Sequence, residues 1–203
     1  RKPYLDANIT DGKAFDIHLT AGDAVHGRRS AGAPFNVYLR NLQVAAGTEP
    51  AKMSVATYVV KAGDTLHPRL PLSLFADGRY SVDVHGPNGF YRSFVGHSVA
   101  RLQVRAAYEK NGSRLTGNMQ ATMRNMGPDP VTVTVNDNSY KSAAVTRKVA
   151  AGTEETIVLP LERSHGWYDF TVQCQGLAAV ARFAGRVETG KGSFTDPLMG
   201  GIA

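Results

Sequence analysis

The 203-residue sequence has little of what marks a disulfide-rich or membrane-spanning protein. Its single cysteine, Cys174, has no partner for an internal disulfide. Cys174 alternates onto the same side as Phe170 and Val172, so we expect a buried side chain that acts as a small hydrophobe. No apolar run approaches the roughly 18 to 20 residues of a membrane-spanning helix. The chain begins at Arg1 with neither a methionine nor an apolar leader, so we expect a fragment or a processed product.

The sequence also lacks the residue patterns on which most enzyme sites are built. Its six histidines stand in no metal-ligand spacing such as His-x-x-x-His, and the Gly-x-Ser-x-Gly motif of α/β-hydrolases is missing. Residues 185–192 approach a phosphate-binding loop, but Gly192 stands where that motif needs a serine or threonine after Lys191. We therefore expect no catalytic residue, no cofactor site and no metal site in this chain.

The charge balance excludes little. The net charge is +6, and the basic residues are scattered apart from the adjacent pair Arg28 and Arg29. A positive net charge favours acidic partners such as anionic lipid, but scattered basic residues are typical of an ordinary solvated surface. We expect no nucleic-acid partner, and we keep Arg28 and Arg29 as candidate contact residues.

The sequence does contain two copies of one segment in which apolar and polar residues alternate. Residues 78–84 (GRYSVDV) and 166–172 (GWYDFTV) alternate with a period of two, which is typical of a strand with one buried face. Each segment follows a Leu-Pro-Leu, at residues 70–72 and 159–161, and each leads to a Phe-x-Gly, at residues 94–96 and 183–185. The chain therefore contains an internal repeat of roughly 90 to 100 residues, a common size for one domain.

Turn signals divide each repeat into about seven short alternating segments, with no convincing helix. Asp11-Gly12 and Asn111-Gly112 each predict a hairpin near the start of a repeat. We predict an all-β chain of two tandem immunoglobulin-like β-sandwich domains, each with its own core. The first covers residues 1–99, the second residues 100–190, and residues 191–203 form a tail. The connector around residues 98–101 is short and has no Gly or Pro, so the two domains should pack together. The expected strands are 4–9, 14–19, 35–39, 55–61, 65–70, 78–84 and 90–95, then 103–109, 114–123, 131–136, 143–149, 154–159 and 166–172.

Two tyrosines stand at equivalent places in the repeats. Tyr80 and Tyr168 each lie two residues before an inward-facing position, as in the tyrosine corner of immunoglobulin-like sandwiches. In such a corner the hydroxyl group bonds to backbone nearby. An ordinary half-buried strand tyrosine explains either position taken alone, whereas two copies in register favour a structural corner.

Candidate contact residues are the large aromatics that alternation assigns to polar faces. Trp167 is predicted to face away from the sandwich interior, where aromatic rings contact sugars, lipids or other domains. The alternative is a ring covered by the tail or by the neighbouring repeat. Phe90 and Tyr91 follow a turn at Asn88-Gly89, and one of these two rings must face outward.

Three segments resemble the C-terminal repeats of bacterial phosphocholine-preferring phospholipase C: residues 86–96 (GPNGFYRSFVG), 166–172 (GWYDFTV) and 183–190 (FAGRVETG), followed by Asp196-Pro197. The resemblance covers nearly the whole chain as two copies. It implies a secreted bacterial enzyme with a large N-terminal catalytic domain, related to acid and alkaline phosphatase-like hydrolases, that cleaves phosphatidylcholine or sphingomyelin. The catalytic residues belong to that domain, and none carries over to this sequence. The second repeat departs from the first because it has Gln175-Gly176-Leu177 in place of the Pro-Asn-Gly turn.

Two functional hypotheses follow from these patterns. In the first, the chain is the non-catalytic C-terminal part of a secreted phospholipase C. It supports the upstream catalytic domain of the same polypeptide and helps that domain meet a lipid surface or an accessory or chaperone protein. In the second, the chain is an independent glycan- or protein-binding β-sandwich module with Trp167 as its platform. An enzyme with an unrecognised site is a weaker third alternative.

Overall fold

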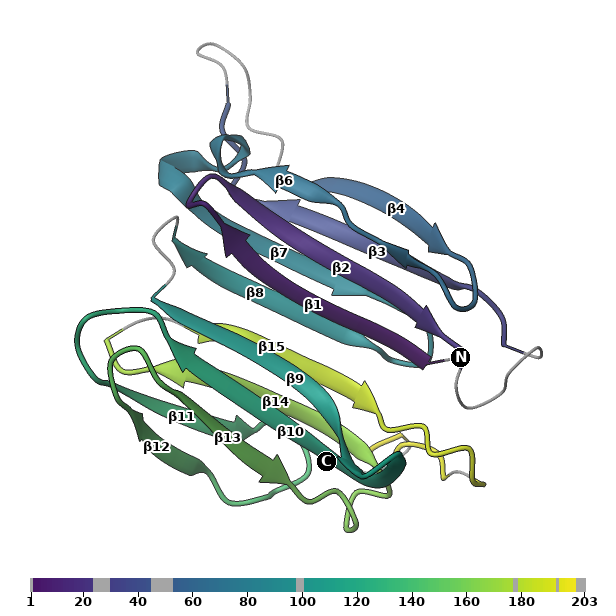
Figure 1. Cartoon of the computed structure of the whole chain (residues 1–203). Helices are drawn as coiled ribbons and strands as arrows, with labels where there is room; N and C mark the ends of the chain where they lie inside the picture. Colours follow the sequence, from purple (N-terminus) through teal and green to yellow (C-terminus); the bar gives the residue numbers. More distant parts are fainter. Residues whose placement is uncertain are drawn as a thin grey trace.

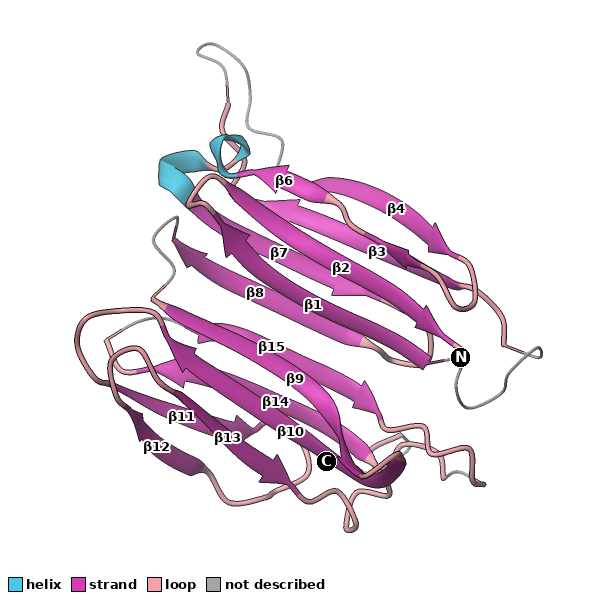
Figure 2. Cartoon of the chain, in the orientation of Figure 1, coloured by secondary structure: helices cyan, strands magenta, loops and turns pink. Residues whose placement is uncertain are grey.

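The alternating segments form strands throughout the part of the chain that the structure, a computed structural model, describes: residues 2–23, 30–44, 53–97, 101–176, 179–192 and 194–199. Strands predominate in both repeats, with helix confined in the described residues to two short 3-10 turns (Figure 2). The all-β prediction is therefore confirmed. The immunoglobulin-like topology stays a prediction.

The first repeat contributes β1 (Lys2–Thr10), β2 (Ala14–Gly22), β3 (Ala33–Arg40), β4 (Ser54–Val60), β5 (Thr65–Leu66), β6 (Arg69–Pro71), the 3-10 turns η2 (Leu72–Leu74) and η3 (Ala76–Gly78), β7 (Arg79–His85) and β8 (Tyr91–His97). The second repeat contributes β9 (Leu102–Asn111), β10 (Arg114–Asn125), β11 (Val131–Asp137), β12 (Val145–Val149), β13 (Glu154–Leu159), β14 (Trp167–Cys174) and β15 (Ala179–Arg186). Both predicted hairpins are present, because β1 pairs with β2 and β9 with β10.

These strands form two layers (Figure 1). One layer consists of two small sheets side by side. One small sheet has the order β1-β2-β5, with β6 also paired to β2, and the other has the order β13-β10-β9. The second layer is a single eight-stranded sheet with the order β12-β11-β14-β15-β8-β7-β3-β4. Each repeat is thus a sandwich, and the two sandwiches share their larger sheet.

The shared sheet arises because β8 and β15, the last strands of the two repeats, pair with each other in antiparallel register. Ala181 lies opposite Phe94, and Ala184 lies opposite Tyr91. This strand pair and the side chains around it form the seam between the two repeats.

The seam corrects the expectation of two separate cores. The buried apolar side chains form one connected cluster through both repeats. Phe94 of β8 contacts Phe15 of β2, with ring centroids 5.7 Å apart, and it also contacts Phe183 of β15 at 5.9 Å. Phe183 in turn stacks on Phe170 of β14 at 5.2 Å. Because aromatic pairs of this kind add stability beyond the area that they bury, the seam is part of the hydrophobic core.

The repeated Phe-x-Gly segments have a steric explanation. Gly96 lies opposite Tyr80 in the β7–β8 pair, and Gly185 lies opposite Tyr168 in the β14–β15 pair. A Cβ atom at either glycine would meet the hydroxyl oxygen and Cζ of the facing tyrosine. Each repeat therefore keeps a glycine there so that a tyrosine ring can lie across the neighbouring strand.

We predict that Gly96→Ala lowers the free energy of unfolding by about 1–3 kcal/mol, because the added methyl group overpacks the site against Tyr80. Urea denaturation measures this loss. Gly192→Ala is the matched control, since a Cβ atom there meets open space. Equal stability of the two variants would contradict the steric explanation.

Candidate functional site

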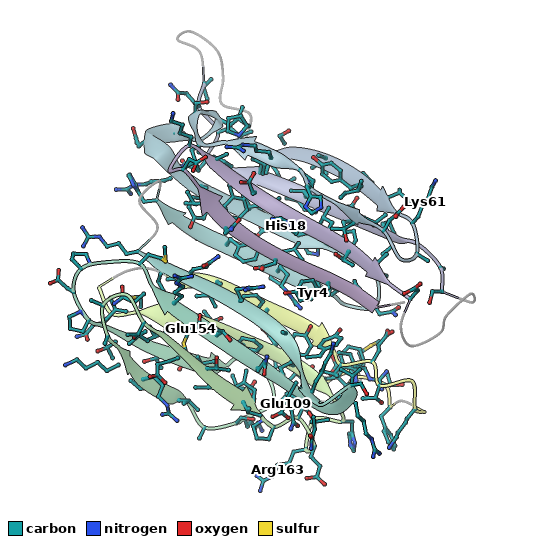
Figure 3. The ribbon with its side chains drawn as sticks, in the orientation of Figure 1. Tyr4, His18, Lys61, Glu109, Glu154 and Arg163 are labelled. Atoms are coloured by element: carbon teal, nitrogen blue, oxygen red, sulfur yellow. The ribbon has the colours of Figure 1, made fainter. Side chains whose placement is uncertain are left out.

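The described residues contain no group of three or more His, Cys, Asp or Glu side chains that could hold a metal ion. The nearest approach to such chemistry is a pair of histidines on the outer face of the first small sheet, where Figure 3 labels His18. The Nδ1 atoms of His18 and His67 lie 2.7 Å apart, which is a hydrogen bond between two imidazole rings. Cys174 is buried as expected, and burial raises the pKa of its thiol. These groups offer no reactive constellation.

The most unusual side chain of the seam is Arg92 of β8, which is only 1% exposed. Alternation turns Arg92 inward, between Tyr91 and Ser93 on the outer face. Its Nη1 donates to the carbonyl oxygens of Tyr91 (2.8 Å) and Ala184 (3.0 Å). Its Nη2 donates to the hydroxyl oxygen of Tyr168 at 2.9 Å. One guanidinium group thus bonds to both repeats.

Aromatic rings surround the Arg92 guanidinium. Its central carbon lies 4.0 Å from the ring centroid of Phe90, 5.2 Å from that of Phe183 and 5.4 Å from that of Tyr168. A weakly hydrated, planar cation is the charged group best suited to such a site, because it stacks on rings while its edges donate hydrogen bonds. The arrangement joins the two repeats through one buried side chain.

Two further contacts join the repeats outside the large sheet. One lies between the small sheets, and the other lies at one end of the molecule. Arg105 of β9 pairs with Asp6 of β1, with Nε 2.8 Å from Oδ2, and this carboxylate raises the pKa of Arg105. Tyr4 lies at the same junction (Figure 3). Asn88, in the turn before β8, donates to Oε1 of Glu188 at 2.8 Å. The expectation that the two repeats pack together is therefore confirmed.

The predicted corner tyrosines lie inside the core. Tyr80 packs on Phe15, with ring centroids 4.9 Å apart, and burial raises the pKa of Tyr80 to about 12. Tyr168 is buried and accepts the hydrogen bond from Arg92 of the other repeat. Sequence reasoning found both positions but not this partner. The predicted bond from each hydroxyl group to upstream backbone stays a prediction.

Phe90 and Tyr91 point to opposite faces of the sheet, as alternation requires, and Phe90 is the one that faces the core. Phe90 is 3% exposed and packs against Phe35, so its selection as a surface contact is wrong in this chain. The turn at residues 86–89 directs Phe90 inward, and Gly86 allows the rings of Phe35 and Phe90 to approach closely. Tyr91 is half-buried on the outer face of the large sheet, where its hydroxyl group donates to Oδ1 of Asp83 at 3.1 Å.

The outer face around Tyr91 is a network of satisfied polar groups. Oδ2 of Asp83 pairs with Nε of Arg40 at 3.0 Å. Asp169 of β14 accepts two bonds from Arg182, at 2.9 and 2.7 Å, and another from Ser139. Burial opposes ionisation of Asp169, yet these donors lower its pKa below the usual range. Charges that are already paired in this way favour an ordinary solvated face.

Trp167 lies on the polar face of β14 as predicted, and it is half-buried. Its Nε1 donates to the carbonyl oxygen of Phe194 in the tail at 3.1 Å, and Arg186 lies over its ring at 5.9 Å. This is the covered arrangement that the sequence left open as an alternative. The other two candidate contact residues, Arg28 and Arg29, fall outside the described residues.

The tail is tied down next to Trp167 and presents apolar side chains to solvent. The hydroxyl group of Tyr140 donates to Oδ1 of Asp196 at 3.2 Å, and the ring of His165 packs on Phe194 at 4.5 Å. Phe194 is 64% exposed, and Met199 is 73% exposed. Together with Leu198, they form the tail cluster: Phe194, Leu198 and Met199. Exposed apolar groups on a fixed segment mark contact surfaces more often than isolated ones do.

The two small sheets leave an apolar groove between them, at the opposite end of the seam from the tail. It has a volume of about 410 Å³ and is lined mainly by apolar residues of β1, β9, β8 and β15. Ile9, Val104 and Phe94 are among these residues. The groove offers shape and apolar surface but no reactive group.

The described residues thus form an all-β pair of sandwiches with an arginine buried at their junction. Comparison with known proteins shows the family. The family described as bacterial phospholipase C, C-terminal domain, matches residues 3–97 and again residues 102–186. The chain therefore belongs to the bacterial phospholipase C C-terminal domain family, and it carries two copies.

The curated relatives are whole phospholipases. Hemolytic phospholipase C of Pseudomonas aeruginosa is 40% identical over 146 residues, which are 68% of this chain and 19% of the relative. Non-hemolytic phospholipase C of the same organism is 38% identical over 153 residues, covering 70% and 21%. That of Burkholderia pseudomallei is 36% identical over 124 residues, covering 59% and 18%. The chain thus spans about a fifth of the length of these relatives.

Similarity to solved structures adds nothing on function. Red sea bream transglutaminase matches 86% of this chain and 29% of its own chain at 13% identity, with a TM-score of 0.24. In the described part of this chain, no helix is long and apolar enough to cross a bilayer.

We predict that Arg92→Ala lowers the free energy of unfolding by about 3 kcal/mol, because three hydrogen bonds of a buried cation are lost and a cavity is left. Denaturation followed by fluorescence and circular dichroism measures the loss, and separate transitions for the two repeats are expected. Arg182→Ala removes a 47% exposed side chain whose partner Asp169 keeps its bonds from Asn138 and Ser139, so it should cost less than Arg92→Ala. Arg92→Met keeps most of the volume if the alanine variant does not fold, and a loss no larger than that of Arg182→Ala would contradict this role.

The raised pKa of Tyr80 predicts a loss of stability in alkali. The unfolded chain releases the tyrosine proton near pH 10, whereas the folded chain holds it to about pH 12, so stability is complete below pH 10 and falls between these values. By about pH 11 the Tyr80 contribution should amount to about 1 kcal/mol relative to about pH 8. Urea denaturation of the wild-type chain and of Tyr80→Phe at both pH values isolates it. Parallel losses in the two proteins would contradict the prediction.

Proposed function

We propose that this chain is the non-catalytic C-terminal part of a secreted bacterial phospholipase C. In this proposal it supports an upstream catalytic domain that hydrolyses phosphatidylcholine or sphingomyelin. The single observation that carries the proposal is the double match to the C-terminal domain family, within relatives that are phospholipases about five times as long as the matched region. The buried seam and the carboxylates of Asp83 and Asp169, which are paired with arginines, support it, because they contribute stability and shape.

The tail cluster is the surface that we assign to contact with the rest of the enzyme or with lipid. Figure 1 shows that β1 starts at the same end of the molecule at which β15 ends and the tail leaves. An upstream domain joined before β1 would therefore lie beside Phe194, Leu198 and Met199, whose exposed side chains it could bury. Burying such a cluster would contribute about 25 cal/mol for each square ångström of apolar surface removed from water.

We predict that the 203-residue chain alone releases no phosphocholine from phosphatidylcholine or sphingomyelin vesicles. Removing the same region from a full-length relative should reduce secretion, thermal stability or turnover on membrane substrate more than turnover on a soluble choline ester. Phosphocholine release by the isolated chain would refute the proposal. A full-length enzyme unaffected by the deletion in all of these measurements would refute the supporting role.

We predict that replacing Phe194, Leu198 and Met199 together by serine leaves the melting temperature of the isolated chain nearly unchanged, because these side chains are exposed. In the full-length enzyme the same change should lower the melting temperature by several degrees or weaken binding to phosphatidylcholine vesicles. The first result would indicate interdomain contact, and the second would indicate lipid contact. Met126→Ser with Val158→Ser, two other exposed apolar positions, is the control. Triple and control variants that behave alike in the full-length enzyme would contradict this assignment.

A further inference from the structure

The two edge strands of the eight-stranded sheet occupy equivalent positions in the two repeats but differ in charge. β4 is the outermost strand at one end, and β12 is the outermost strand at the other. Val60 and Val149 are both buried at the ends of these strands, and each is followed by an Ala-Gly turn. This alignment makes Thr57 the counterpart of Thr146, since each bonds to a side chain of the neighbouring inner strand.

At the β12 edge the counterparts of Tyr58 and Val59 are Arg147 and Lys148. Charged side chains on an edge strand prevent other strands from pairing with it, because their charges would have to be desolvated or brought close to one another. The β12 edge therefore has the protection that monomeric sheet proteins normally carry.

The β4 edge has no such protection. Its seven residues, SVATYVV, carry no charge and no proline, and they are rich in residues that favour strands. Val55 is 50% exposed and Val59 is 68% exposed, and β3 is the one strand of the described residues that pairs with β4. An uncharged, exposed edge strand of this length is a template for pairing with another strand.

We propose that the strand that pairs with β4 is β4 of a second copy of this chain, so that two large sheets join antiparallel about a two-fold axis at Thr57. The strand is self-complementary in that register. Val55 would lie opposite Val59 of the second copy, Thr57 opposite its own counterpart, and Ala56 opposite Tyr58. Pairs of β-branched residues and Thr–Thr pairs are among the cross-strand combinations that stabilise antiparallel sheets.

The same comparison explains why the assembly should stop at two copies. Pairing of β4 with β12 would leave one free edge of each kind and extend without limit. Arg147 and Lys148 oppose that arrangement, and antiparallel self-pairing of β12 about Arg147 would bring like charges directly opposite each other. A two-fold contact through β4 alone leaves, of the two large sheets, only their β12 edges exposed.

The dimer should be weak. One strand pair buries less surface than the roughly 1,200–2,000 Å² of stable interfaces, so we expect a dissociation constant on the order of 10 µM to 1 mM. Sedimentation equilibrium of the 203-residue chain across that concentration range should show a reversible monomer–dimer equilibrium. A chain that stays monomeric throughout, or that forms larger species, overturns the proposal.

Charge variants at Thr57 test the register. Thr57→Lys and Thr57→Glu should each raise the dissociation constant at least about tenfold, because like charges would meet at the axis. An equimolar mixture of the two variants should regain the dimer, since lysine then faces glutamate. Thr146→Lys on the β12 edge is the matched control and should associate like the wild-type chain. Association that survives in both Thr57 variants, or a mixture that stays monomeric, overturns the proposed contact.

Discussion

The pairing of β8 with β15 is the interaction on which the rest of the structure depends. It turns two sandwiches into one body with a common eight-stranded sheet, and it places Arg92 where its guanidinium bonds to Ala184 and Tyr168 of the other repeat. The aromatic contacts from Phe15 through Phe94 to Phe183 continue the core across this junction. A buried cation is costly unless its donors are used. Nη1 and Nη2 of Arg92 are both bonded and two of these three bonds reach the second repeat, whereas its Nε is buried without a hydrogen-bond partner.

In the function proposed above, this architecture would position other parts of a larger enzyme. The carboxylates of Asp83 and Asp169, on the outer face of the large sheet, are both bonded to arginines. A long, stiff sheet offers a fixed spacing between its two ends. Membership of the phospholipase C C-terminal domain family, in duplicate, is consistent with such a scaffold role.

The sequence predicted the strands well and their neighbours poorly. Period-two alternation decides which side of a strand is buried, so the core positions of β7 and β14, the inward Cys174 and the polar-face position of Trp167 were predictable. Alternation does not say which strands lie side by side, and so the joining of β8 to β15 and the continuous core were missed. The clue to the seam was Arg92, a charged residue at an inward-facing position. Phe90 was kept as a contact candidate because alternation required only that one of Phe90 and Tyr91 face outward, although Phe90 alternates onto the same inward side as Arg92 and Phe94.

The seam also has a consequence for how the chain folds during synthesis. Arg92 and Phe183 face each other although one belongs to the last strand of the first repeat and the other to the last strand of the second. The first repeat therefore leaves the ribosome with the β8 edge and its guanidinium still uncovered, and that edge pairs only when β15, the last strand of the second repeat, has emerged. The β8 edge of a nascent first repeat can therefore mispair for most of the time that the second repeat is being translated. The two repeats complete their shared sheet together, when β15 pairs with β8.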